Sequence, residues 1–192
     1  MAEKQSAVYV LNHRPLASGS GLAGLAQALG TLPSIDSQSA FNGYCQEACR
    51  LWGQYFPEGR GTTSGRFREL LGRVDAGGEG VIPTPWGGVV VTRHAPPQVE
   101  KYLVIRQGGY LALETHSQKL EHLEVQEGAG LILWRSEADH ALAVQELKPS
   151  ETFDFRPGME HCIIGTEDLL VFETSSDPKG MDQDLIFIYT PL

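Results

Sequence analysis

Two short segments of the chain carry residue types that bind divalent metal ions. The first contains His116 and, five residues later, Glu121, and the second contains His161, forty residues beyond Glu121. Two imidazoles and one carboxylate can occupy one face of a metal ion, and this donor set suits Zn, Ni, Mn or Fe. The residue types and their spacing therefore predict a site for a divalent metal ion.

Alternation along two expected strands places these side chains, because successive residues of a strand point to opposite faces. Glu121 shares a face with Leu123 and Val125, which puts one carboxylate on an apolar row expected to face inward. In residues 110–116, His116 shares a face with Glu114, and either this face or the opposite one points inward. If His116 points inward, Glu114 does too, and the cavity is polar.

The same segments resemble the two motifs of the cupin family, and within it the cupin domain of type II mannose-6-phosphate isomerases. The first motif there runs Gly, seven residues, then His-His-His-Arg-x-Glu-His-Trp, followed by a second Gly. Here Gly108 precedes the residues His-Ser-Gln-Lys-Leu-Glu-His-Leu of 116–123, and Gly128 closes the motif. Residues 158–161 resemble the second motif, and the resemblance extends over about residues 84–190.

The resemblance implies a metal ion bound by His116, Glu121 and His161, with Gln118 as a weak fourth ligand. Gln118 stands where the family has a third His, and Lys119 stands where it has Arg. An amide oxygen binds a hard or borderline ion less strongly than an imidazole does. We therefore expect a weakened or selective site.

The implied function is metal-dependent isomerisation of a sugar or sugar phosphate, in which a proton moves between adjacent carbons through an enediol. The metal would polarise the substrate oxygens, and Glu114 would act as the base. A phosphate group would need cations, for which the candidates are Lys101, Lys119 and Arg156.

Two other functions stay open. The replacement of two of the three consecutive His residues favours a non-catalytic cupin that binds a sugar-like ligand or a partner protein. A set of two His and one carboxylate also suits an Fe(II)-dependent oxygenase. Because cupin jelly rolls commonly pair, the resemblance further implies a homodimer.

The elements that must position these residues fall into two parts. Apolar residues recur at helical spacing in residues 22–29 and 41–56, and Ser64 is expected to cap a third helix over residues 65–74. Glycines at 77, 78 and 80 then break the pattern. We expect residues 1–80 to form a helical segment packed on a β-barrel.

The second part, residues 81–192, reads as short strands separated by turns. The expected strands are residues 89–92, 100–106, 110–116, 122–126, 131–135, 141–147, 152–155, 169–173 and 185–189. Short strands at even spacing are typical of sandwiches and barrels. Together with the two motifs, they predict a mainly β protein built on a cupin-type jelly-roll barrel.

Composition limits the partners and the compartment. The net charge of −9, from 15 Lys and Arg against 24 Asp and Glu, argues against nucleic acid or an anionic membrane surface as a partner. With no leader pattern and no apolar run of about eighteen residues, we expect a cytoplasmic protein. The odd count of three Cys fits reduced thiols, and parity places Cys162 on the face opposite His161.

Overall fold

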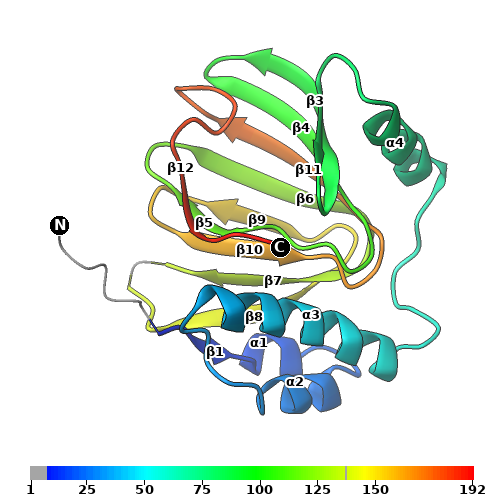
Figure 1. Cartoon of the computed structure of the whole chain (residues 1–192), viewed down its shortest axis with the longest axis vertical. Coiled ribbons are helices and arrows are strands. Elements are labelled where there is room, and N and C mark those ends of the chain that lie inside the picture. Colours follow the sequence, from blue (N-terminus) through cyan, green and yellow to red (C-terminus); the bar gives the residue numbers. More distant parts are fainter. Residues whose placement is uncertain (1–7, 137) are drawn as a thin grey trace.

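The structure of the protein is a computed structural model that describes residues 8–136 and 138–192. In this part of the chain, two six-stranded β-sheets face each other (Figure 1). The lower sheet of Figure 1 has the order β1 (Val10–Asn12), β8 (Ala141–Leu147), β7 (Gly130–Arg135), β10 (Glu160–Ile164), β5 (Leu113–His116) and β12 (Leu185–Tyr189). The upper sheet has the order β2 (Val81–Thr84), β3 (Gly87–Ala95), β4 (Gln98–Ile105), β11 (Leu169–Ser176), β6 (Leu120–Gly128) and β9 (Thr152–Phe155).

The connections between the strands are those of a jelly roll. After β4 the chain passes back and forth between the sheets, so that β5, β7 and β10 lie in the lower sheet and β6, β9 and β11 in the upper sheet. Neighbouring strands are antiparallel, apart from the parallel pair of β1 and β8. The predicted mainly β jelly roll with N-terminal helices is confirmed.

The space between the sheets is filled from both sides by alternating apolar side chains. On β6, Leu123 and Val125 are buried in this inner cluster, and Glu121 lines the adjoining cavity, as the alternation predicted. The remaining fully buried members include Ile105, Ile132, Ile163, Leu169 and Val171. Because one register shift would turn the whole row outward, this apolar row fixes the direction of the Glu121 side chain.

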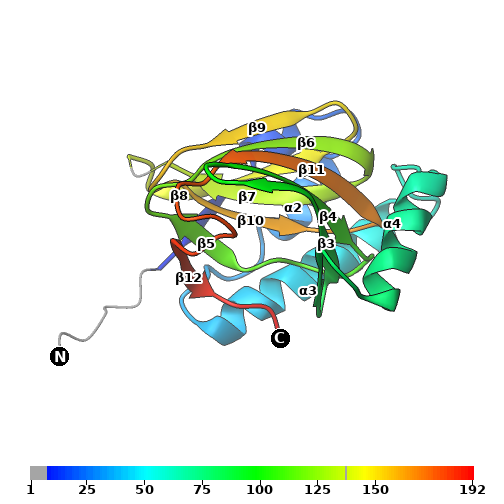
Figure 2. The ribbon, with the colours of Figure 1, turned by 90° about the horizontal axis from the view of Figure 1, so that it is seen from above.

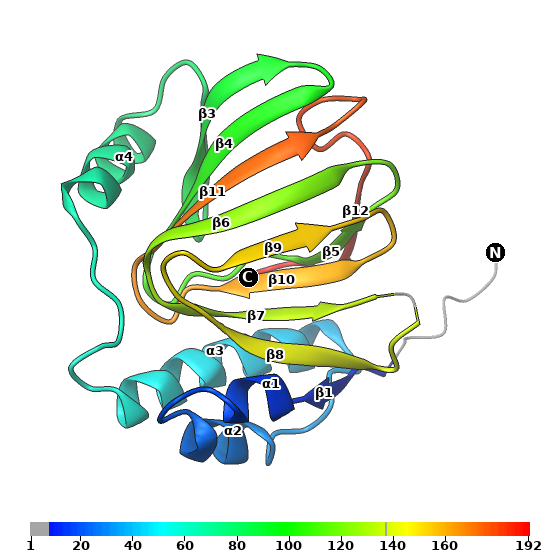
Figure 3. The same cartoon turned by 180° about the vertical axis from the view of Figure 1, so that it is seen from behind.

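Three helices cover the outer face of the lower sheet, namely α1 (Arg14–Ala17), α2 (Ala23–Leu29) and α3 (Gln38–Tyr55) (Figures 1 and 3). The Ser37 hydroxyl caps α3 by accepting a hydrogen bond from the Ala40 amide at 3.2 Å. The aromatic stripe of α3 packs on the sheet, with Phe41 and Trp52 fully buried. Cys162, one residue after His161, lies in this outer cluster, which confirms the parity prediction.

A fourth helix, α4 (Gly65–Ala76), lies outside the upper sheet against β3 (Figure 2). The Ser64 side chain caps it, as predicted, by accepting from the Arg66 amide. The linker from α3 to α4 runs past the end of the sandwich where β6 finishes (Figure 3). Glu167 accepts hydrogen bonds from the backbone amides of Arg60 and Gly61, at 2.6 and 2.8 Å, and Glu127 accepts from the Ser64 amide at 2.6 Å.

The sequence pattern missed β1, β2 and β10, and it began β5 three residues too early. β1 has three residues and gains its hydrogen bonds only by pairing with β8, so local alternation carries no signal for it. β2 contains Pro83, which a strand tolerates at a sheet edge. Tyr110 makes only an isolated bridge to Ile164, because the turn at residues 106–109 leaves it outside the regular pairing.

Within residues 8–136 and 138–192, no helix is long and apolar enough to cross a membrane.

Candidate metal centre

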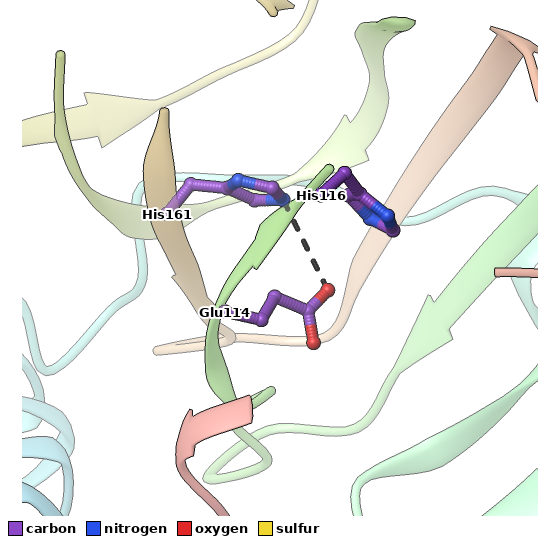
Figure 4. Close-up of side chains that lie close together, drawn as sticks. All are labelled: Glu114, His116 and His161. Carbon is purple, nitrogen blue, oxygen red and sulfur yellow. Dashed lines mark ion pairs between the residues drawn. The ribbon is translucent and has the colours of Figure 1, made fainter. Parts of the chain in front are cut away.

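Strands β5, β6 and β10 direct four ionisable side chains into the space between the sheets. In the lower sheet β5 pairs with β10, with His161 opposite Glu114, and His116 ends β5 two residues further on. Figure 4 shows Glu114, His116 and His161 pointing toward one another. Glu121 approaches from β6 in the upper sheet and is buried, as are both His residues.

The ligand atoms of these side chains converge. Glu121 Oε2 lies 3.1 Å from His161 Nε2 and 3.7 Å from His116 Nε2. Glu114 Oε1 lies 3.9 Å from His161 Nε2, and single ligand atoms of Glu114, His116 and His161 all fall within 4.8 Å of one another. The structure therefore brings the three expected ligands together and adds Glu114 to the same place.

The donor set fits a divalent cation. Glu121 Oε2 is buried and has no hydrogen-bond partner among the described residues, while two imidazole nitrogens face it. An unsatisfied carboxylate oxygen in a dry site is costly, and a cation bound there would satisfy it. The His161 ring is held by stacking on Phe155, with ring centroids 4.2 Å apart.

Asp184 fixes the orientation and tautomer of His116. Its Oδ1 lies 2.9 Å from His116 Nδ1, and its Oδ2 accepts from the backbone amides of Gln118 and Lys119, at 2.6 and 2.9 Å. Burial opposes ionisation, but the hydrogen bonds from His116 and the two amides lower the pKa of Asp184 to about 2. An ionised Asp184 accepts a hydrogen bond from His116 Nδ1–H, and His116 Nε2 then directs its lone pair at the site.

Two buried lysines occupy the other side of Glu121. Lys119 Nζ lies 2.6 Å from Glu121 Oε1 and 2.7 Å from Glu173 Oε1, and it also binds Asp182. Lys101 Nζ lies 3.2 Å from Glu173 and binds Asp182 as well. Both ammonium groups are therefore neutralised by the protein's own carboxylates.

The carboxyl group of Glu114 has a pKa that is raised toward neutral pH. Burial is the main cause, the carboxylates of Glu121 and Asp182 add to it, and together they raise the pKa of Glu114 to about 7 although His161 opposes the shift. A carboxyl group with such a pKa can exchange protons near neutral pH, which is what a general base requires.

A cavity of about 440 Å³ opens above this cluster. Its floor is polar and includes Glu114, Glu121, His161 and Lys119. Its walls are largely apolar, with side chains that include Trp86, Leu103, Leu111, Leu185 and Phe187. The expectation of a polar cavity is therefore right for the floor and wrong for the walls, because Leu111 precedes the regular part of β5 and packs with the inner cluster.

Two predicted site residues are not brought to this cavity. The Gln118 side chain is exposed, because Gln118 lies in the turn before β6, where its backbone amide binds Asp184. Arg156 is exposed and does not line this cavity; it borders a second depression, whose lining includes Glu121 and the surface pair of His122 and Asp154. Within the described chain, the structure offers neither side chain to the metal centre.

Three acidic residues at the site were missed by the sequence analysis. Glu173 looked like part of a strand, and Asp182 and Asp184 lie in the loop between β11 and β12. Asp177 shapes this loop by accepting from the backbone amides of Gly180 and Asp182, both at 2.8 Å. Two Asp residues so close together, at 182 and 184, could have indicated a site, but they lie far along the chain from the two motifs.

Comparison with known proteins identifies the architecture. No family model and no curated protein sequence matches the chain. Among solved structures, the capsular polysaccharide assembling protein CapF from Staphylococcus aureus superposes with a TM-score of 0.50 at 19% identity, over 57% of this chain and 34% of CapF. The chain has a cupin-type jelly-roll fold.

Two further cupin structures are less similar. Oxalate decarboxylase from Lactobacillus farciminis gives a TM-score of 0.47 at 16% identity, over 56% of this chain and 32% of that one. KdgF from Halomonas sp. gives 0.44 at 16% identity, over 55% and 93%. The chain thus spans about a third of the length of CapF, and these comparisons give no support to the narrower resemblance to mannose-6-phosphate isomerases.

Proposed function

We propose that this cupin is a metal-dependent isomerase that interconverts an unphosphorylated aldose and ketose. The observation that carries the proposal is the closeness of Glu114 to the converging atoms of His116, Glu121 and His161, beside a cavity that Glu114, Glu121 and His161 line. An enediol route needs a base that moves a proton and a metal that polarises the substrate oxygens, and here a carboxyl group that can exchange protons lies beside a metal site.

His116, Glu121 and His161 would hold the divalent metal, which supplies Lewis-acid polarisation of the substrate's carbonyl and hydroxyl oxygens. Glu114 takes the proton from the carbon next to the carbonyl onto a carboxylate oxygen, where it can exchange with solvent, and delivers a proton to the former carbonyl carbon. The hydroxyl proton passes between the two neighbouring substrate oxygens, so the reaction moves two protons and leaves the composition unchanged. Asp184 holds the His116 ring in place throughout.

The ion pairs of the cavity favour a substrate without phosphate. Among the described residues that line it, the ammonium groups are those of Lys101 and Lys119, and each already binds two or three carboxylates. Arg156 lies elsewhere. A phosphate would meet carboxylates rather than free cations. This argues against the expected phosphate binding by Lys101, Lys119 and Arg156.

One observation also favours an Fe(II)-dependent oxygenase. The three converging ligands are two His and one carboxylate, and the cavity walls above them are largely apolar. Such walls accept a substrate less polar than a sugar. The identity of the metal separates the two functions, since iron favours the oxygenase and Zn, Ni or Mn favours the isomerase.

The proposal is tested by metal analysis and by hydrogen exchange. Protein purified without added metal is analysed by mass spectrometry, then loaded and incubated in deuterated water with a panel of aldoses and their phosphates. We expect deuterium at the carbon next to the carbonyl with an unphosphorylated sugar. Sugar binding with no exchange would instead support the non-catalytic reading, and an absence of both would contradict the proposal.

Three variants assign the roles of the carboxylates. Glu121→Gln should lose metal and exchange together, whereas Glu114→Gln should retain metal and lose exchange. Glu124→Gln is the matched control, because Glu124 lies on the same strand as Glu121 and is not among the residues that line the cavity. Retained exchange in Glu114→Gln would remove Glu114 as the base.

A further inference from the structure

Glu121 faces a buried ammonium group with one carboxylate oxygen and the metal position with the other. Its Oε1 accepts a hydrogen bond from Lys119 Nζ at 2.6 Å, while its Oε2 faces His116 Nε2 and His161 Nε2. Lys119 is 1% exposed, so water does not screen its charge. The Glu121 carboxylate therefore pairs with a buried ammonium group through one oxygen and can bind a metal through the other.

Lys119 is buried among three carboxylates. Its Nζ lies 2.6 Å from Glu121 Oε1 and 2.7 Å from Glu173 Oε1, and it also binds Asp182. In this cluster three carboxylates face the ammonium groups of Lys101 and Lys119, so most of the negative charge is already compensated before a metal arrives.

We propose that Lys119 is a built-in counterion that competes with the divalent metal for Glu121 and keeps metal affinity low. The inference rests on the metal site of the proposed function. A divalent ion on Oε2 and the ammonium group on Oε1 repel each other across a single carboxylate, in surroundings where charges are weakly screened. In the metal-free protein the same ammonium group prevents a cluster of unpaired buried carboxylates, so the barrel does not need metal in order to fold.

Two substitutions test this inference, one that removes a positive charge and one that removes a negative charge. Lys119→Gln removes the ammonium group but keeps a hydrogen-bond donor toward Glu121. Glu173→Gln removes a carboxylate that holds Lys119 at 2.7 Å and is not among the converging ligand atoms. Lys148→Gln is the matched control, because Lys148 is a surface residue with a side chain that is 57% exposed.

The measurement is titration calorimetry of the metal-free full chain with Zn²⁺ and with Mn²⁺. We expect Lys119→Gln to tighten binding by about tenfold or more and Glu173→Gln to weaken it by about tenfold or more, with Lys148→Gln unchanged. Opposite signs identify a charge effect, because loosening of the site by either substitution would weaken binding in both.

The outcomes separate this inference from the proposed function. If the wild-type chain binds metal and Lys119→Gln binds it equally or more weakly, the counterion role is wrong while the metal site stands. If the wild-type chain and both charge variants bind no metal, the metal site itself is wrong and the inference falls with it. Should Lys119→Gln fail to fold by circular dichroism, Glu173→Gln decides: weaker binding supports the inference, and equal or tighter binding overturns it.

Discussion

Asp184 determines which nitrogen of His116 is free to bind a metal. We predict that Asp184→Asn weakens metal binding by about 10- to 100-fold, the usual cost of losing the partner that orients a metal-binding His. The reason is that an amide can present its NH₂ group to His116 Nδ1 and so lose the constraint on the tautomer. Titration with Zn²⁺ measures the change.

The matched control for this prediction is Asp154→Asn. Asp154 makes the same kind of pair with His122, at 2.8 Å, but on the exposed surface away from the metal centre. Its substitution should leave metal affinity unchanged. Equal affinities of Asp184→Asn and the wild-type chain would show that His116 needs no orientation by a carboxylate.

At the residue scale, the sequence predicted the parts of the site that depend on local spacing. His116 and Glu121 lie on consecutive strands of opposite sheets, and alternation predicted the inward direction of Glu121 but left that of His116 open. Lys119 could not be assigned its role in this way, because a Lys in a turn normally lies in solvent and its burial depends on Glu173 and Asp182, which follow 54 and 63 residues later.

Helix α3 is joined to the lower sheet by its aromatic stripe. We predict that Phe41→Ala lowers the free energy of unfolding by about 3–5 kcal/mol, because Phe41 is fully buried and packs with Tyr110 and Tyr189. Urea denaturation followed by circular dichroism measures this loss. Tyr55→Ala on the same helix should cost less than about 1 kcal/mol, since Tyr55 is 44% exposed.

At the element scale, strands β8, β9 and β12 begin and end at the predicted residues, although β9 and β12 lie at sheet edges. Strand β1 has three residues and pairs with β8, which lies far along the chain. Strand β2 contains Pro83, which breaks the expected pattern of a strand. Such strands are set by tertiary pairing, so their own residues carry little signal.

The whole molecule depends on its N-terminal helices. We predict that a chain beginning at residue 82 aggregates or melts at a lower temperature, because it uncovers the outer face of the lower sheet. That face includes five fully buried side chains, those of Leu131, Leu133, Leu142, Val144 and Ile164. Burial of apolar surface contributes about 25 cal/mol per Å², so the uncovered face is worth several kcal/mol.

Calorimetry of the shortened and full chains tests this prediction at equal protein concentration. A soluble shortened chain with an unchanged melting temperature would make the helices an independent appendage. The homodimer that the family resemblance implies stays a prediction, which sedimentation equilibrium of the full chain would test.

The linker between α3 and α4 is held at the end of the sandwich away from the metal centre. Glu167 and Glu127 clamp the linker where β6 finishes, whereas Glu121 lies near the start of β6, about 20 Å away. The linker and these two carboxylates thus join the helices that cover the two sheets at this end of the sandwich. Because neither Glu127 nor Glu167 lines the cavity, the linker holds the covering helices without narrowing the space above the metal centre.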